Sequence, residues 1–459
     1  MRTRHTFQLF AIMLCAATMA AAQNTPARYL RSNLPEQWTP EAANTATLPT
    51  DDAWWSGFGD ATLDTLLAIG ENNNFDIAMA ARRADAALRG VQSARAGYFP
   101  TIGATAGWQR ARTAGVIDGG YALGLHASWE PDLFGKVRAQ VKHSGYLYDA
   151  GRAEYTAAMI SVCAQIATAY FDLRTAQAQK QVAEEHIGRQ QHIVEITQAR
   201  HKAGLASALD VAQARTVLFS TQASLPLLDT QISADINAIA TLCGMYAADL
   251  APLLQPRTGL QPDCRRIVNA GVPASLLRRR PDIVAAEANI GAASAALGIA
   301  RKDYLPTLAI TGSIGTEAAR PSGLFKDGSM TWSVAPTLSW TVFDGLARRA
   351  GVASARDEME AQIANYNATV LNAVQEVENA LSTYTNDMRR ISTLSDVVEQ
   401  SRISLELSVD QYKQGLSPFT NVVDAQMNYL EYTNSLLSAR GDALVALATL
   451  YRALGGGTE

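Results

Sequence analysis

The sequence predicts an α+β membrane protein built from one structural unit that is used twice. Residues 75–107 and 281–315 carry the same pattern: Asp-Ile opens an Ala-rich helical stretch, and Ala-Arg, an aromatic residue and Pro-Thr close it before an alternating segment. Internal repeats define the architecture of a chain before local detail does. The residues matched between the two copies are Asp76 and Asp282, Arg95 and Arg301, Tyr98 and Tyr304, and Pro100 and Pro306.

The beginning of the chain predicts export from the cytoplasm. Residues 1–22 combine basic residues, an apolar run and the small-residue end Ala20-Ala21-Ala22, which is the form of a cleaved signal peptide. A lipid anchor on Cys15 is the alternative, but the bulky Leu14 before it favours cleavage. No later stretch approaches the roughly 20 apolar residues of a transmembrane helix. The mature chain is therefore expected to be soluble outside the cytoplasm or to enter a membrane as strands.

Composition excludes some classes of function. The 459 residues carry a formal net charge of −4 with mixed signs, which gives no indication of nucleic-acid binding. Three cysteines follow the signal, and an odd number does not form a disulfide framework. Cys243 and Cys264 flank a Pro-rich connector and are candidates for a bridge in an oxidising periplasm. Cys163 lies in an Ala-rich helical stretch, where we expect it to be buried packing.

Two very long helices are expected, one in each half. Residues 136–202 and 346–413 contain no proline, and apolar residues recur in them at helical spacing. The first would be about 100 Å long if it is continuous. Helices this long pack as coiled coils rather than around a globular core, and breaks at Gly145, Gly151 or Gly188 would not explain two equal lengths. The apolar stripes are Ile160, Cys163, Ile166, Ala167, Tyr170 and Leu173 in the first half, and Val370, Val374, Val377 and Leu381 in the second.

Each long helix is expected to end in a tight turn and to continue into a returning helix. Gly204 and Gly415 follow the helical stretches, where a residue with positive φ commonly ends a helix. Ser207 and Ser417 are candidate caps of the returning helices, with Pro418 in the first turn of the second one. The expected helical hairpins span 136–243 and 346–454.

The segments that follow the short helices alternate as strands do. Residues 121–130 and 330–342 each place apolar side chains on one face and small or polar side chains on the other. A strand of a soluble sandwich would show the same pattern. Strand lengths, hydroxylated polar faces and tryptophans favour transmembrane strands instead. The expected aromatic girdle consists of Trp108, Trp129, Trp332 and Trp340.

The strand count predicts an oligomer. Each half supplies one strand pair, within 101–134 and 306–343. Four strands cannot close a barrel, because the smallest barrels have eight. An open sheet edge is not viable in lipid. We therefore expect several chains to share one barrel.

This order of elements, together with three motifs, resembles the outer membrane factors, which are the TolC-like channels, and in particular their NodT/OprM-like branch. The resemblance extends along nearly the whole mature chain, and the combination of motifs is specific where each alone would be weak. The motifs are Trp54-Trp55-Ser-Gly-Phe-Gly-Asp-Ala-Thr-Leu-Asp-Thr-Leu, Leu276-Leu-Arg-Arg-Arg-Pro-Asp-Ile283 and Tyr451-Arg-Ala-Leu-Gly-Gly-Gly457.

The resemblance implies a homotrimeric duct with a shared twelve-stranded barrel in the outer membrane and a helical coiled-coil tunnel across the periplasm. An equatorial domain would include residues 23–62 and 244–280, beside the repeats 63–243 and 281–454. Family members are passive exit ducts of tripartite RND-type efflux systems for drugs and other small molecules. Their partners are a periplasmic adaptor (membrane fusion) protein and an inner-membrane pump. A type I secretion duct for polypeptides is the alternative.

The resemblance also implies a periplasmic gate. The family closes this end with acidic residues on the returning helices, and the motif transfers that role to Asp424. Three carboxylates around one axis repel one another and attract cations, which suits a charge-sensitive gate. Thr420 stands one turn earlier, where the family usually has an apolar residue, so a hydrophobic seal there is in doubt. Tyr412 and Lys413 match positions that latch neighbouring helices, although an ordinary amphipathic pair would look the same.

The hairpin tips are the expected adaptor contact, because leucines at the distal ends of a duct favour tip-to-tip packing. Arg278, Arg279 and Arg280 form a basic run that we interpret as the flank of a helix start at Pro281, with a membrane-surface role as the alternative. The tip residues are Gly204, Leu205, Ala206 and Ser207 in the first half, and Gly415, Leu416 and Ser417 in the second.

No enzyme, cofactor or metal site is expected. None of the six histidines has metal-ligand spacing, and the sequence contains no nucleophile, phosphate-binding or dinucleotide-binding motif. A non-channel coiled-coil scaffold on the cell surface is the rival hypothesis, against which the Trp-flanked alternating strands argue.

Overall fold

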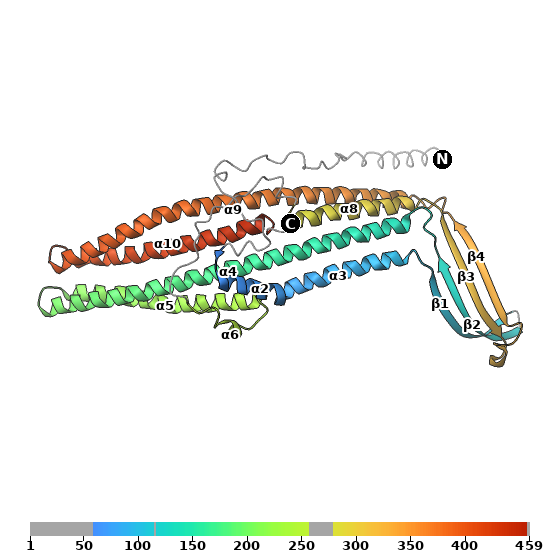
Figure 1. Ribbon diagram of the computed structural model, residues 1–459, viewed down its shortest axis with the longest axis horizontal. Coiled ribbons are helices and arrows are strands. Elements are labelled where there is room, and N and C mark those ends of the chain that lie inside the picture. The colour runs from blue at the N-terminus through green and yellow to red at the C-terminus, as the bar shows by residue number, and fades with distance from the viewer. Residues whose placement is uncertain (1–57, 114–115, 257–278, 457–459) are drawn as a thin grey trace, which may run out of the picture.

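The computed structural model describes residues 58–113, 116–256 and 279–456. The chain is elongated, with a β-sheet at one end, the tips of two helical hairpins at the other, and short helices near the middle (Figure 1). The signal peptide, Cys15, Cys264 and most of the segments 23–62 and 244–280 lie outside the described residues.

The predicted duplication is confirmed in the lengths of the helices. The short helices have 22 residues each, the long helices 67 each and the returning helices 35 each. Both long helices are continuous, so the glycines in the first one do not break it. In order of the three classes, the pairs are α3 (Phe75–Ala96) and α8 (Pro281–Lys302), α4 (Lys136–Lys202) and α9 (Ala347–Lys413), and α5 (Ala208–Leu242) and α10 (Phe419–Ala453).

Three short elements complete the described chain. Helix α2 (Ala61–Asn73) precedes the first repeat, α6 (Ala247–Leu250) follows α5, and the 3-10 turn η4 (Pro321–Gly323) lies between the last two strands. Asp60 caps α2 by accepting a hydrogen bond from the Thr62 amide at 2.9 Å. Helices α2 and α6 lie at the level where the helical hairpins meet the short helices α3 and α8 (Figure 1).

The four strands form one antiparallel sheet in the order β1-β2-β3-β4. The pairing of β2 with β3 joins the two repeats, while β1 and β4 form the edges of the sheet. The strands are β1 (Thr101–Thr113), β2 (Val116–Trp129), β3 (Thr307–Ala318) and β4 (Met330–Ser339).

Three expected strand boundaries were wrong. Strand β2 begins at Val116 rather than at 121, and it ends at Trp129 rather than near 134. The cause lies in the next residues, because the carboxylate of Asp132 accepts the amides of Val137 and Arg138 at 3.0 Å and so caps the first turn of α4. Likewise β4 ends at Ser339, and Asp344 accepts the amide of Arg348 in the first turn of α9.

The registers give the sheet one apolar and one polar face. Leu125 pairs with Ile314, which pairs with Trp332 on the next strand. On the other face the hydroxyl groups of Ser313 and Ser333 hydrogen-bond at 2.8 Å. Since paired residues point to the same face, the alternation noted in single strands is coherent across the whole sheet.

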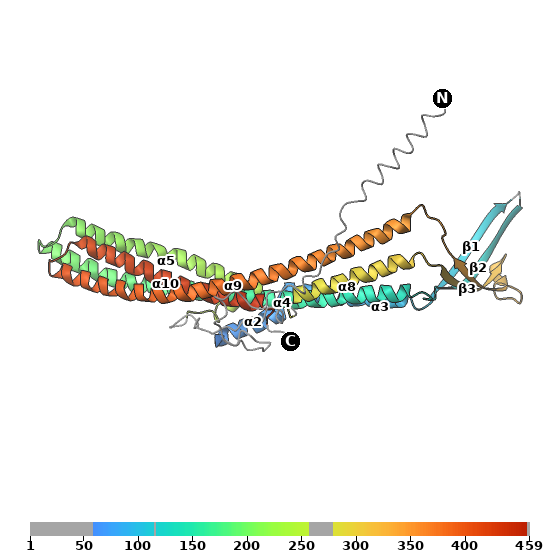
Figure 2. The same ribbon diagram turned by 90° about the horizontal axis from the view of Figure 1, so that it is seen from above.

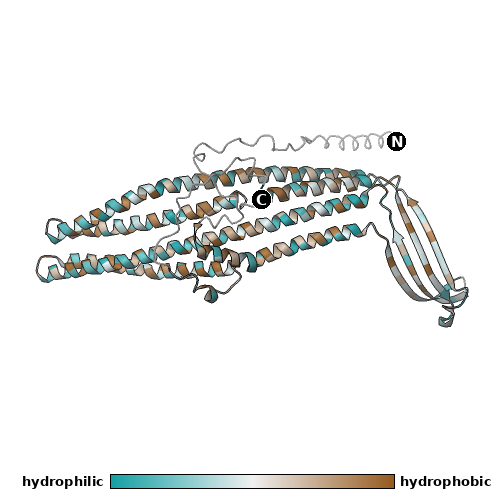
Figure 3. Cartoon of the chain, viewed as in Figure 1, coloured by the Kyte–Doolittle hydropathy of each residue, from teal (hydrophilic) through white to brown (hydrophobic). Residues whose placement is uncertain are grey.

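The helices pack through narrow stripes rather than around a globular core. All six apolar stripe residues predicted for α4 are buried, among them Ile166 and Tyr170 with 0% exposure. Figure 2 shows the hairpins side by side along the long axis, and Figure 3 shows hydrophobic residues as short patches between hydrophilic ones.

Helices α4 and α8 each contain a window of residues that is long and apolar enough for a membrane span, which the sequence analysis did not identify. About half of each window is buried inside the structure (50% and 44%). Each window therefore has one part packed against the bundle and another part outside that packing.

Candidate gate, hairpin tips and equatorial junction

Each hairpin tip is built on a glycine in the left-handed region. Gly204 has φ +75° and Gly415 has φ +77°. The Leu205 amide donates to the Arg200 carbonyl at 2.8 Å, and the Leu416 amide donates to the Gln411 carbonyl at 2.9 Å. These are the bonds of a Schellman motif, which satisfies the last carbonyl groups of a helix. The glycine prediction is confirmed in both halves.

The two tips differ in how the returning helix begins. Ser207 caps α5, and it forms a reciprocal capping box with Asp210. Ser417 does not cap α10: Pro418 occupies the cap position without a side-chain hydrogen bond, and the Ser417 hydroxyl accepts from Asn421 at 2.8 Å instead. The expected cap at Ser417 was therefore wrong, because the helix begins one residue later, at Phe419.

The tips expose apolar side chains to solvent. Leu205 and Leu416 are 67% and 74% exposed, whereas Ala206 and Ser417 are partly covered. The Ala206 carbonyl is held by the His201 ring at 2.8 Å. The turn is thus fixed by local hydrogen bonds while its leucine remains free for a contact.

A small apolar cluster, called here the tip cluster, joins the two hairpins behind the tips. The Tyr412 ring packs against Phe419 at 5.0 Å and lies under the Arg200 guanidinium at 4.9 Å. Arg200 also donates to the carbonyl oxygen of Lys413. The tip cluster consists of Ile193, Val194, Ala214, Leu218, Tyr412, Phe419 and Val422.

Tyr412 contacts both hairpins. Its hydroxyl lies 3.5 Å from Oδ2 of Asp210 on α5, and burial, followed by the negative charge of Asp210, raises the pKa of Tyr412. Lys413 contributes its main-chain oxygen, while its ammonium group pairs with Asp410 on the same helix at 3.5 Å. The sequence did not single out Arg200 or Asp210, because both also read as ordinary charges near helix ends.

Thr420 and Asp424 lie one turn apart on an exposed face of α10. Their neighbours Val422 and Ala425 are buried, which fixes the opposite face of the helix against the bundle. Periodicity therefore places both polar side chains on one surface stripe. In the single chain this stripe faces solvent.

A buried histidine lies further along the same helices. His186 of α4 is 4% exposed and packs against the Tyr429 ring of α10 at 4.9 Å. Arg189 also lies over the Tyr429 ring, 5.7 Å from the ring centre. Burial, then the charge of Arg189, lower the pKa of His186 to about 4, so its imidazole is neutral at neutral pH.

An aromatic contact at mid-length, the equatorial junction, joins the start of the described chain to its end. The Phe58 ring packs against Phe171 of α4 at 5.0 Å and against Tyr451 of α10 at 6.2 Å. The Tyr170 hydroxyl donates to Asp60 at 2.5 Å. Residues of the N-terminal and C-terminal sequence motifs therefore meet on the middle of α4.

Arg280 brings the third motif to the same region. Its guanidinium donates to Asp282 at 2.7 Å, to Glu376 at 2.9 Å and to the Ala453 carbonyl at 2.7 Å, and the residue is 7% exposed. The interpretation of Arg280 as only the flank of a helix start was wrong, because it is a buried tie between α8, α9 and the end of α10. Arg279 next to it is exposed.

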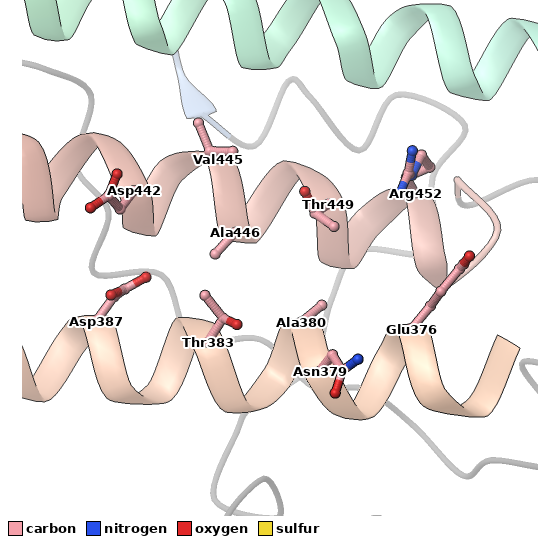
Figure 4. A pocket seen from close by; sticks show the side chains of 10 residues that line it. All are labelled: Glu376, Asn379, Ala380, Thr383, Asp387, Asp442, Val445, Ala446, Thr449 and Arg452. Carbon is pink, nitrogen blue, oxygen red and sulfur yellow. The ribbon is translucent and has the colours of Figure 1, made fainter. Parts of the chain in front are cut away.

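A pocket of about 530 Å³ opens between α9 and α10 beside Arg280 (Figure 4). Two of its carboxylates are paired, Glu376 with Arg280 and Asp442 with Arg390 at 3.4 Å, whereas Oδ2 of Asp387, which also lines the pocket, is buried without a hydrogen-bond partner among the described residues. Across the described residues, no group of three or more His, Cys, Asp or Glu side chains is arranged to hold a metal ion.

The four tryptophans lie on the sheet end of the chain, and all are exposed. Trp108 and Trp332 are in the strands, where Trp108 contacts the Tyr121 ring at 6.5 Å. Trp129 ends β2, and Trp340 directly follows β4. Two tryptophans therefore lie at the helix-proximal end of the sheet and two lie farther along the strands.

Comparison with known proteins agrees with this architecture. The family described as outer membrane efflux protein matches residues 68–245 and 272–456. The solvent efflux pump outer membrane protein SrpC of Pseudomonas putida is 31% identical over 412 residues, which cover 87% of this chain and 86% of that protein. Nodulation protein T of Rhizobium leguminosarum bv. viciae is 30% identical over 447 residues, covering 95% and 90%. The solved structure of the outer-membrane channel OprN superposes with a TM-score of 0.83 at 31% identity, covering 92% of this chain and 98% of that one.

The resemblance inferred from the three motifs is thereby confirmed. The matched family consists of channels rather than enzymes, and the match includes both repeats. The chain thus belongs to the outer membrane efflux protein family, with the fold of a TolC-like channel of the outer membrane that extends into the periplasm.

Proposed function

We propose that three copies of this chain form the exit duct of a tripartite RND-type efflux system. The observation that supports this most is the sheet, whose faces are apolar and polar and whose edges, β1 and β4, have no partner among the described residues. An edge strand in lipid leaves main-chain groups without hydrogen bonds. Pairing β4 of one copy with β1 of the next satisfies both edges, and three copies give a closed barrel of about twelve strands.

The polar face then lines a wet lumen, and the apolar face contacts lipid. The helices continue the wall into the periplasm as a coiled-coil tunnel, with the equatorial junction as a belt at mid-length. A duct of this kind is passive, so energy and selection come from an inner-membrane pump. The relatives named for solvent and toluene efflux support small apolar or amphipathic molecules as cargo rather than polypeptides.

The gate is assigned to Asp424 with Thr420, and the latch to Tyr412 with Lys413. Asp424 stands on an exposed stripe of a returning helix, near the tips, where three copies would converge around the axis. The tips, with Leu205 and Leu416 exposed, are assigned to the periplasmic adaptor.

The assembly is tested with the full-length protein extracted from outer membranes. We expect a band of trimer mass that dissociates only on heating, and ion conductance when the same material is added to planar bilayers. A monomer recovered from the soluble periplasmic fraction would contradict the proposal and favour a coiled-coil scaffold. For cargo, deletion of the gene should lower the tolerated concentration of toluene or of amphipathic antibiotics, and export of a polypeptide instead would indicate type I secretion.

A further inference from the structure

Trp129 and Trp340 make the same hydrogen bond in the two repeats. The indole Nε1–H of Trp129 donates to the main-chain oxygen of Tyr98 at 3.1 Å, and that of Trp340 donates to the main-chain oxygen of Tyr304 at 3.0 Å. Each tyrosine lies two residues beyond the end of a short helix. The bond therefore joins the end of a β-hairpin, at Trp129 in β2 or at Trp340 directly after β4, to the turn that follows the helix leading into that hairpin.

Two prolines explain why an indole donor is used at this point. The register pairs Thr101 with Ser128 and Thr307 with Ser339, so the next positions opposite each other are Pro100 with Trp129 and Pro306 with Trp340. Proline has no N–H group and cannot extend the ladder. In each repeat the indole reaches past the proline to the carbonyl two residues before it.

The acceptor is a group that needs a donor. Tyr98 and Tyr304 lie beyond the last helical residue and before the first strand residue, so neither the helix nor the strand ladder provides a donor for their carbonyl groups. A hydrogen bond from an indole N–H satisfies this oxygen and also fixes the direction of the indole. Across the described residues, neither Trp108 nor Trp332 has an indole hydrogen bond to the protein.

We infer that Trp129 and Trp340 are positioning residues. Their indole hydrogen bonds, called here the clasp, hold the base of each β-hairpin to the end of the preceding helix and so fix the sheet on the helical tunnel. The predicted girdle thereby divides into two kinds of tryptophan. The indole N–H groups of Trp108 and Trp332 are available to lipid headgroups or water. Those of Trp129 and Trp340 donate to main-chain oxygens of the protein. The inference concerns the junction alone and does not depend on the cargo or the pump.

Other contacts close to the indole bonds join the ends of neighbouring helices to one another. Lys136 at the start of α4 pairs with Asp303 just beyond the end of α8 at 2.7 Å, and Lys302 donates to the Gly135 carbonyl. These bonds join helix to helix. Arg348 of α9 also donates to the Thr341 carbonyl beyond β4 at 2.8 Å, but among the described residues only the indole bonds occur in both halves and join a strand end to the end of the preceding helix across the proline.

The test replaces each tryptophan by phenylalanine, which removes the N–H group and keeps an aromatic ring at the membrane surface. Full-length Trp129→Phe and Trp340→Phe proteins are compared with the matched controls Trp108→Phe and Trp332→Phe. Amide hydrogen exchange is followed by mass spectrometry in lipid nanodiscs. Loss of one hydrogen bond corresponds to about a five- to tenfold faster local opening.

We expect this acceleration at residues 96–103 and 126–135 for Trp129→Phe, at the equivalent residues of the second repeat for Trp340→Phe, and at neither base for the controls. Equal acceleration in all four variants would overturn the clasp and leave only a girdle role, and no acceleration at either base would also overturn it. If a variant fails to insert into the membrane, the clasp is tested in the wild-type protein instead, by measuring the exchange rates of the indole N–H groups after ¹⁵N-tryptophan labelling. Among the seven labelled indoles, the clasp requires slow exchange at positions 129 and 340 relative to 108 and 332, and equal exchange at these four positions would exclude it.

Discussion

The guanidinium of Arg280 donates to the main-chain oxygen of Ala453 at 2.7 Å, so the start of the second repeat is tied to its end across 173 positions of sequence. The same side chain holds Glu376 on α9 and Asp282 on α8. One buried cation therefore sets the relative positions of three helices at the equatorial junction.

Replacing Arg280 with methionine should destabilise the protein. The change keeps the length of the side chain but leaves two carboxylates and a helix-end carbonyl without their partner, at a cost of about 2 to 3 kcal/mol, discounted because both carboxylates are partly exposed. We expect less protein in the outer membrane and a lower dissociation temperature of the trimer. Arg279→Met, at the exposed neighbouring position, is the control and should behave like the wild type. Equal losses in both variants would contradict the role given to Arg280.

Asp424→Ala is expected to raise single-channel conductance about twofold or more and to lower cation selectivity in planar bilayers. The reason is that three carboxylates near one axis both narrow the pore and concentrate cations. Asp424→Asn separates these effects, because it removes the charge and keeps the size. Unchanged conductance and selectivity in both variants would show that Asp424 does not line the constriction.

Leucine at Gly204 or Gly415 should abolish efflux while the trimer remains intact. A side chain in the left-handed region costs about 1 to 2 kcal/mol per residue and displaces the turn that presents the exposed leucine. Gly188→Leu is the control, since Gly188 lies within α4 with open space around its α-carbon. Drug tolerance and trimer mass are measured together, so a variant that lost both would indicate misfolding rather than a lost adaptor contact.

Arg200→Met should loosen the contact between the two hairpins near the tips. Arg200 lies 4.9 Å over the Tyr412 ring and holds the Lys413 carbonyl, so its loss removes both interactions. We expect higher conductance, and a smaller change for Tyr412→Phe, which removes only a hydroxyl at a distance of 3.5 Å from Asp210. Arg402→Met, which breaks only exposed pairs on α9, is the matched control. A conductance equal to that of the control would count against a latch.

Acid should destabilise the tunnel through His186. Its pKa is lowered to about 4 in the folded protein, whereas an unfolded histidine has a pKa of about 6.5. The stabilisation is complete above the unfolded pKa and is lost as the pH falls from about 6.5 towards 4, because the unfolded chain then binds a proton that the folded one excludes. His186→Phe should flatten this part of the pH profile of trimer dissociation. His192→Phe, at an exposed histidine of the same helix, should not.

The repeated architecture was readable from the sequence because its signals are local and periodic. The buried stripe through Ile166 and Tyr170, the glycines that end the long helices and the alternation of the strands all follow from spacing along the chain. The returning helices also began within one residue of their expected positions.

The contacts that were missed lie between distant segments. Arg280 has partners 96 and 173 positions away, and Arg200 meets a carbonyl 213 positions away. Periodicity carries no information on such pairs, so Arg280 was interpreted from its local setting at a helix start. The indole bonds of Trp129 and Trp340 were also invisible, because the alternation shows which face a tryptophan occupies but not what its N–H group reaches.

The order of the strands has a consequence for how the channel is made. With β1 and β4 at the edges, one copy or a chain of two copies still ends in two open strands, each a template for pairing with a wrong partner. In the proposed trimer only the third copy removes both at once. Because three copies must meet before the sheet closes, the yield of closed barrels rises steeply with the concentration of the chain in the periplasm. A cell that makes too few would lose them to aggregation and proteolysis before any pore exists.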